Sequence, residues 1–421
     1  MTEQALLRSR SHTESEPSPP AEVAPVTAPP PKKIRSAHDL AINGAPPLFE
    51  EPLHGGRPNI GSADRFLARA RAILETGWLS NNGPRVIEFE KRIAEMLGVR
   101  HCVAMCNGTI ALEIATRALE LKGEVIVPSY TFVATAHALQ WQEITPVFAD
   151  IDPATHNLDP KAVRRMITPR TTGIIGVHLW GRGAPVRELQ AIADEHRLKL
   201  MFDASHGFGN TLGGTPLGTF GHCEVFSFHA TKFFNTFEGG AVVTNDDRLA
   251  EKMRLMRNFG FKGYDNVIYP GTNGKMTEIA AAMGLTNLED LDSFVAINRR
   301  NYETYREGIS RIPGLHLLGY DARESNNYQY VIVEVAPNFP VDRDRLVEIL
   351  HAENILARKY FWPGCHNMEP YKSLYPHAGL VLPNTIQVAE RVVVLPTGSA
   401  IGVDDIRVIT SILQLLAKGS I

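Results

Sequence analysis

Two chemically capable residues, Asp203 and Lys232, each follow a strand-like apolar run. Lys232 lies shortly after the run 225–228 and among phenylalanines, so its amine should be partly desolvated, with a lowered pKa. An uncharged amine attacks an aldehyde to form a Schiff base. Asp203 ends the run 198–203, where a carboxylate is costly unless it is paired. A protonated ring nitrogen would be such a partner, so the two residues together indicate a pyridoxal phosphate site. The alternatives, an exposed structural lysine and a helix-capping aspartate, remain open.

Other candidate residues would hold the phosphate of such a ligand. The segment 106–109 joins a predicted strand to a predicted helix. Gly108 would let the backbone come close, and Thr109 would stand at the helix start, where free N–H groups attract an anion. The hydroxyl of Ser227 could donate to the same group. The alternative is an ordinary helix cap.

A third set of residues would contact the ring. Phe132 follows a predicted strand and could stack on a flat heteroaromatic ring, or could belong to the core. His206 could hydrogen-bond a phenolic oxygen, or could be a satisfied core histidine. Ligands of parallel α/β sheets bind at the carboxyl ends of the strands. All these segments follow predicted strands, so we expect them to converge on one ligand.

The elements that must position these residues alternate along the chain. Continuous Val/Ile/Phe runs between helical segments predict strands buried on both faces of a mainly parallel sheet. A long helical stretch is predicted over 277–309, and a smaller α+β domain follows it. We expect a disordered Pro-rich tail at 1–35, a large domain at 36–290 and a small C-terminal domain at 291–421.

Composition narrows the classes of function. Hydrophobic residues make up 44% of the 421 residues and charged residues 21%, as in a soluble globular protein. A net charge of −3 gives no electrostatic reason to bind nucleic acid or an anionic membrane. The four cysteines lack zinc-like spacing, so we expect no metal and a reducing cytoplasm. No signal peptide or membrane span is predicted.

Several motifs together resemble the fold-type I sugar aminotransferases of the DegT/DnrJ/EryC1/StrS family. The resemblance extends over nearly the whole chain after about residue 45, and each motif alone is weak. The motifs are Gly-Trp-Leu-Ser-Asn-Asn-Gly-Pro (77–84), Asn-Gly-Thr (107–109), Pro-Ser-Tyr-Thr-Phe-Val-Ala-Thr (128–135), Pro-Val-Phe-Ala-Asp-Ile-Asp-Pro (146–153), Val-His-Leu-Trp-Gly (177–181), Asp-Ala-Ser-His-Gly (203–207) and Ser-Phe-His-Ala-Thr-Lys (227–232) followed by Glu-Gly-Gly.

The resemblance implies an aspartate aminotransferase-like fold and pyridoxal phosphate held covalently by Lys232, with Asp203 at the ring nitrogen. It implies Phe132 on the ring, His206 near the ring oxygen, and Gly108, Thr109 and Ser227 at the phosphate. It also implies a homodimer in which Asn273 reaches the partner's phosphate. The usual amino donor is L-glutamate, which turns the cofactor into pyridoxamine phosphate, and the usual acceptor is a keto group on a nucleotide-linked sugar.

Two positions depart from the family pattern. Lys275 replaces a common arginine and loses its bidentate geometry, which puts a phosphate or carboxylate role there in doubt. Phe237 replaces a glycine that often precedes Glu238, so the short turn there should differ.

The segment 357–371 resembles a subgroup that aminates C4 of dTDP-4-keto-6-deoxy-D-glucose, often in antibiotic or surface-glycan amino-sugar pathways. In that case Arg358, Tyr360 and His366 would border the substrate. The alternative is an irregular connection that packs on the large domain.

Other functions stay open. C3 amination and cyclitol acceptors belong to the same family. Related sugar dehydratases carry histidine in place of the lysine, so Lys232 disfavours dehydration. A regulator that binds the cofactor without turnover is the third alternative, because a fold does not fix a function.

Overall fold

The computed structural model describes residues 34–419. The tail predicted at 1–35 therefore lies, except for its last two residues, outside the described residues. No helix among residues 34–419 is long and apolar enough to cross a membrane.

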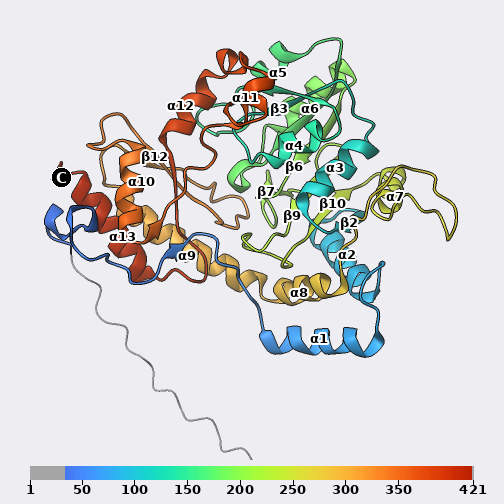
Figure 1. The fold of residues 1–421 in the computed structure, drawn as a ribbon, viewed down its shortest axis with the longest axis horizontal. Coiled ribbons are helices and arrows are strands. Elements are labelled where there is room, and N and C mark those ends of the chain that lie inside the picture. The colour runs from blue at the N-terminus through green and yellow to red at the C-terminus, as the bar shows by residue number, and fades with distance from the viewer. Residues whose placement is uncertain (1–33, 420–421) are drawn as a thin grey trace, which may run out of the picture.

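A mainly parallel sheet forms the centre of the larger body (Figure 1), as the sequence predicts. Among the described residues this sheet has seven strands, in the order β2-β10-β9-β6-β5-β3-β4. β10 runs antiparallel to β2 and β9, and the other neighbouring pairs are parallel. The strands are β2 (His101–Met105), β3 (Glu124–Pro128), β4 (Thr145–Ala149), β5 (Thr171–Val177), β6 (Lys199–Asp203), β9 (Cys223–Ser227) and β10 (Gly240–Thr244).

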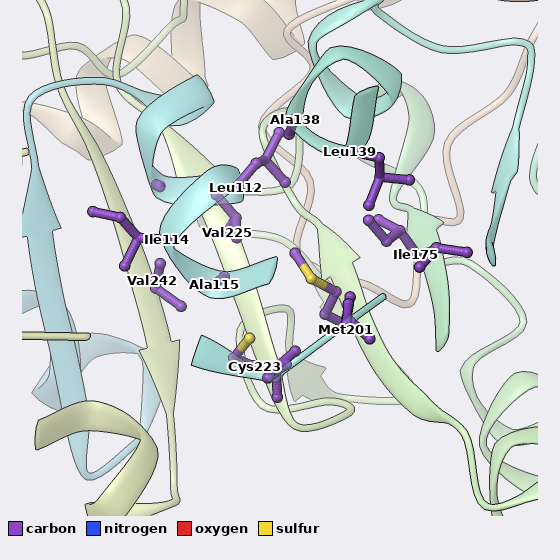
Figure 2. Close-up of a cluster of buried hydrophobic side chains, with 14 of the residues drawn as sticks. Leu112, Ile114, Ala115, Ala138, Leu139, Ile175, Met201, Cys223, Val225 and Val242 are labelled. Carbon is purple, nitrogen blue, oxygen red and sulfur yellow. The ribbon is translucent and has the colours of Figure 1, made fainter. Parts of the chain in front are cut away.

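Helices cover both faces of this sheet because its strands are apolar on both sides. On one face pack α3 (Gly108–Ala118), α4 (Ala134–Gln140) and α7 (Asp247–Met256). Figure 2 shows side chains of α3, such as Leu112, packed against Val225 of β9 and Val242 of β10. On the other face pack α2 (Pro84–Leu97), α5 (Pro160–Met166), α6 (Val186–His196) and α8 (Glu278–Glu289). This layering places every parallel strand's carboxyl end at one edge of the sheet.

A smaller body has its own apolar core around an antiparallel sheet of β11 (Leu315–Leu317), β12 (Val331–Val335) and β14 (Val392–Leu395). Its main helices are α9 (Leu291–Ile309), α10 (Arg343–Ala352) and α13 (Val403–Leu416). Residues near the start of the described chain also belong to this core: Leu40 is fully buried in it, and β1 (Leu53–His54) pairs with β13 (Ile355–Leu356). The domain boundary at 290/291 stays a prediction, and we propose that residues 37–54 belong to the smaller domain.

The remaining elements, α1 and several short ones, complete the fold. They are α1 (Ala63–Thr76), α11 (Tyr371–Leu374), α12 (Pro383–Arg391), β7 (Thr211–Leu212), β8 (Thr215–Pro216) and the 3-10 turns Ala37–Asp39, Ala41–Asn43, Leu179–Gly181, Cys365–Asn367 and Ala378–Val381. Although α12 follows the smaller body's segments, its start is tied to the large sheet: the N–H groups of Asn384 and Thr385 donate to Asp150, just after β4.

The helical stretch predicted over 277–309 is interrupted. α8 and α9 meet at Asp290, which leaves helical geometry at φ −109° and ψ 8°. Its carboxylate accepts the N–H of Ser62 and pairs with Arg65, so α1 is attached at the break. The sequence predicted one continuous helical stretch, because the contacts from the distant Ser62 and Arg65 at Asp290 cannot be read from the local pattern.

The start of α2 depends on a buried carboxylate from α8. Glu278 is 1% exposed and accepts the N–H groups of Arg85 and Val86 at 2.8 and 2.9 Å. We predict that Glu278→Ala lowers the free energy of unfolding by about 1–3 kcal/mol, because it leaves two N–H groups without acceptors. Denaturant unfolding followed by tryptophan fluorescence measures this, with the more exposed Glu88→Ala as control. Equal midpoints for the two variants would contradict this role for Glu278.

Candidate active site

A cavity of about 580 Å³ opens at the carboxyl edge of the large sheet. The segments after β2, β3, β6 and β9 reach it, and the smaller body closes part of its wall. Its lining residues are Asn107, Gly108, Thr109, Ile110, Leu112, Thr131, Phe132, Ala134, Val177, Asp203, Ser205, His206, Ser227, His229, Thr231, Lys232, Glu238, Tyr330, Tyr360 and Phe361. The cavity therefore brings together the predicted residues Gly108, Thr109, Phe132, Asp203, His206, Ser227, Lys232 and Tyr360.

Lys232 lies in the loop between β9 and β10. The ends of the loop are joined, since the N–H of Phe228 donates to the carbonyl of Gly239. Within the loop, the N–H of Lys232 donates to the carbonyl of His229 in a turn. Desolvation lowers the pKa of the Lys232 amine to about 8, and the charge of Asp203 opposes that shift. A larger share of the amine is thus uncharged near neutral pH than for an ordinary lysine, as the sequence predicts.

Asp203 ends β6 with both carboxylate oxygens hydrogen-bonded. The N–H of Ser205 donates to Oδ1 at 3.0 Å, and the hydroxyl of Thr135 donates to Oδ2 at 2.9 Å. The Thr135 hydroxyl lies 3.2 Å from that of Thr131, which can donate to it in turn. Asp203 is 5% exposed and does not cap a helix. Its orientation is fixed, and each oxygen keeps a lone pair for a further donor in the cavity.

His206 lies beside Asp203 as a neutral ring with a defined tautomer. The backbone N–H of Trp180 donates to Nδ1 at 3.3 Å, so the imidazole proton is on Nε2. Burial and the nearby Lys232 charge hold the His206 pKa well below its usual range. The ring is packed in an aromatic block, at 11° to the plane of Trp180 and 4.8 Å from the centroid of Tyr330. His206 can therefore act as a hydrogen-bond donor without carrying a charge.

The segment from Asn107 to Thr109 forms an anion cradle. Asn107, not Thr109, caps α3 by accepting the N–H of Ile110, so the N–H groups at the helix start remain outside the helical ladder. A Cβ at Gly108 would lie 2.9 Å from the Cβ of Ser227, so a side chain there would fill the space. A Cβ at Gly240 would lie 2.6 Å from the carbonyl of Asn107, and glycine allows β10 to pass.

These groups fit pyridoxal phosphate. Gly108, Thr109 and Ser227 would hold the phosphate, and Asp203 the ring nitrogen. Phe132 is 56% exposed and belongs to the cavity wall, not to the core. The cofactor, when bound, supplies an electron sink for a carbanion beside the ring.

Asn273 and Lys275 do not line this cavity. Asn273 is exposed, in a bridge to Asn258. The Lys275 amine donates to Asn258 at 3.1 Å and lies 4.7 Å above the ring of Phe259, beside a separate cavity of about 200 Å³. Burial and the charge of Arg257 lower its pKa. Their predicted roles toward a partner subunit and a substrate stay predictions.

Of the three residues predicted to border the substrate, Arg358, Tyr360 and His366, one lines the cavity and two do not. Tyr360 lines the cavity, and the guanidinium of the exposed Arg358 lies 4.8 Å from the centroid of its ring. His366 is 2% exposed and lies outside the cavity lining, where its Nδ1 is 2.7 Å from the hydroxyl of Ser129. Direct contacts of Arg358 and His366 with a substrate stay predictions.

Several residues that line the cavity or support its lining were not predicted from the sequence. Thr135 supports Asp203 from the first turn of α4, and Trp180 fixes the tautomer of His206. Both belong to motifs that the resemblance had singled out, so a search for polar and aromatic residues within those motifs could have found them. Tyr330 and Phe361 come from the smaller body. Phe361 lies in the segment 357–371 already expected near the substrate, whereas no local signal pointed to Tyr330.

Phe237, which stands where glycine often precedes Glu238, adopts φ 65°. This left-handed conformation favours glycine, which explains the common residue there. The ring packs edge-on against Phe66 of α1, with centroids 5.5 Å apart. The packing contact offsets part of the backbone strain, and the Glu-Gly-Gly turn still leads into β10.

Comparison with known proteins gives the family. The model of the DegT/DnrJ/EryC1/StrS aminotransferase family matches residues 62–414. The chain belongs to this family. It is a sugar aminotransferase that depends on pyridoxal phosphate, in agreement with the cradle, the aspartate and the lysine described above.

The sequences of individual relatives align with most of this aminotransferase. The dTDP-4-amino-4,6-dideoxy-D-glucose transaminase of Shigella dysenteriae is 36% identical over 366 residues, which are 87% of this chain and 99% of the relative. GDP-perosamine synthase of Caulobacter vibrioides is 35% identical over 353 residues, 82% and 93% of the two chains. The structure of DesI in the presence of its TDP-sugar product is similar with a TM-score of 0.87 and 50% identity, and the match covers 90% of this chain and 96% of DesI.

The contact between Thr135 and Asp203 yields a prediction that needs no substrate. We expect Thr135→Val to weaken binding of pyridoxal phosphate to the apoenzyme about tenfold or more, because a hydrogen bond to a charged group contributes about 1.5–3 kcal/mol. Fluorescence titration of the apoenzyme measures the Kd. Thr135→Ser keeps the hydroxyl and serves as control; equal Kd values for the valine and serine variants would show that the hydroxyl does not hold Asp203 for the ring.

Proposed function

We propose that the enzyme transfers the amino group of L-glutamate to C4 of a nucleotide-linked 4-keto-6-deoxy sugar, with dTDP-4-keto-6-deoxy-D-glucose as the preferred acceptor. Glutamate leaves as 2-oxoglutarate and the sugar leaves as a 4-amino sugar. The observation that carries this proposal is the Lys232–Asp203 cavity in a chain whose relatives include a dTDP-4-amino-4,6-dideoxy-D-glucose transaminase and DesI with a TDP-sugar.

The residues of the chain have separate tasks in this reaction. Lys232 would carry the cofactor and, once freed from it, its uncharged amine would take a proton from the substrate carbon and return one. Asp203 would keep the ring nitrogen protonated, and neutral His206 would donate from Nε2 to the ring oxygen. The cradle at Gly108 and Ser227 would fix the phosphate, so that the reacting carbon stays near the Lys232 amine.

A dehydratase of the same fold is disfavoured by Lys232 itself, and a binding-only regulator by the complete set of groups around it. The predicted cytoplasmic location and a place in antibiotic or surface-glycan amino-sugar synthesis are part of the proposal. The homodimer is also part of it.

Removal of the lysine tests the chemistry. We predict that Lys232→Ala abolishes both the conversion of glutamate and the amination of the keto-sugar, because the amine that binds the cofactor and moves the proton is gone. The variant should also lose the absorption band of the lysine-bound cofactor. Product analysis by mass spectrometry and NMR, with dTDP- and UDP-linked keto-sugars, identifies the acceptor in the wild type. Loss of water without gain of an amine would favour the dehydratase.

The exposed apolar surface supports the homodimer. α1 lies along α8 at the outside of the large body (Figure 1) and, with the following turn, exposes Leu67, Leu74, Trp78 and Leu79 by 50–74%. Large exposed apolar groups of this kind mark association surfaces. The position of Asn273 outside its own cavity is consistent with a role in a partner's cavity.

Complementation of two variants tests whether sites are shared. We expect Lys232→Ala and Asn273→Ala to be strongly impaired alone. If Asn273 serves the partner's site, random mixing of the subunits restores about a quarter of the wild-type activity, because each mixed dimer regains one intact site. The measurement is steady-state activity after the two variants are unfolded and refolded together, with each refolded alone as control. No recovery in mixed dimers would mean that each subunit uses its own Asn273.

A further inference from the structure

The wall of the cavity is built from two segments that the chain brings together from different bodies. The segment after β3 contributes Thr131 and Phe132, and the segment after β13 contributes Tyr360 and Phe361. Phe132 is expected on the cofactor, whereas Tyr360 and Phe361 come from the smaller body. The contacts that hold these two segments together therefore determine the shape of the space left for a substrate.

Hydrogen bonds join the two segments behind the wall. The hydroxyl of Tyr130 donates to the carbonyl of Tyr360 at 2.8 Å, and the N–H of Cys365 donates to the carbonyl of Ser129 at 2.9 Å. A third connection between the segments is formed by Ser129 and His366. The Ser129 hydroxyl accepts the N–H of His366 at 3.0 Å, so its own proton is directed to Nδ1 of the same residue at 2.7 Å.

The Ser129–His366 pair is closed to solvent. Ser129 is 0% and His366 2% exposed, and among the described residues Nε2 of His366 has no hydrogen-bond partner. Burial lowers the pKa of His366, against the charge of Asp150, and the ring is a neutral acceptor at Nδ1. A Cβ at Gly364 would lie 3.0 Å from the imidazole and 3.2 Å from the Ser129 hydroxyl, so glycine admits the pair.

We propose that Ser129 and His366 are positioning residues for the sugar half of the reaction. They act through the wall, by fixing Tyr360 and Phe361 relative to Phe132. For His366 this role replaces the direct contact with the substrate that the sequence predicts. This inference rests on the proposed function, since it assigns the smaller body's wall to the sugar acceptor. It predicts that loss of the pair changes recognition of the sugar and leaves the glutamate half of the reaction intact.

The kinetic test compares Ser129→Ala and His366→Leu with His366→Asn, which keeps an acceptor near the place of Nδ1. The exposed Ser373→Ala in the same region is the matched control. We expect the first two variants to raise the KM for the keto-sugar at least about fivefold while the rate of glutamate conversion stays within about twofold. His366→Asn and Ser373→Ala should resemble the wild type in both. Equal losses in both half-reactions, or no change in either, would overturn the proposal.

A second measurement does not use the sugar. Arg358 and Lys359 precede Tyr360, and trypsin cleavage after them in the native protein reports how often this segment opens. We expect Ser129→Ala to be cut there faster than wild type and Ser373→Ala, with the other tryptic sites unchanged. Cleavage rates equal to the wild type would overturn the proposal. If the wild type converts glutamate but aminates no nucleotide-linked keto-sugar, the proposed function fails, and the cleavage rates still decide whether the pair holds the segment.

Discussion

The carboxylate of Asp203 is the constraint on which the site depends. It is buried at the end of a strand, where an ionised group is stable only if its oxygens are hydrogen-bonded and its charge is balanced. The protein supplies two donors, from Ser205 and Thr135, and leaves room for a third. The Lys232 amine is close enough to Asp203 for the two charges to interact. Desolvation nevertheless lowers the pKa of this amine to about 8. The balancing cation must therefore come largely from the ligand, and a protonated pyridine ring meets that need.

The two bodies contribute different kinds of residue to the cavity. The large sheet fixes the parts that any enzyme of this chemistry needs: an anion cradle, a carboxylate for the ring nitrogen, and an amine. The smaller body adds Tyr330, Tyr360 and Phe361, three aromatic side chains that bring no charge to the lining.

The sequence predicted the large sheet and its site well because both depend on local signals. Apolar runs marked β6 and β9 within two residues, and the polar residues that follow them had to meet at one edge of a parallel sheet. Features that arise from contacts between distant segments were not predictable in this way. The break at Asp290, the support of Asp203 by Thr135 and the burial of His366 against Ser129 each join residues far apart in the chain. For His366, the resemblance of the segment 357–371 to a subgroup of the family indicated a place near the substrate, but only the structure showed that the ring is buried against Ser129.

The pairing of β1 with β13 sets an order of assembly. Leu53 lies beside Ile355, and Leu40 is buried among residues that follow position 300. During synthesis, the segment around these residues leaves the ribosome long before its partner strand and helices exist, whereas the large sheet is complete once β10 has been made. Contacts between such distant residues form late, because the loop between them must first be closed. The smaller body therefore folds after the large sheet, and the aromatic wall of the cavity is finished only after Tyr360 and Phe361 have been synthesised.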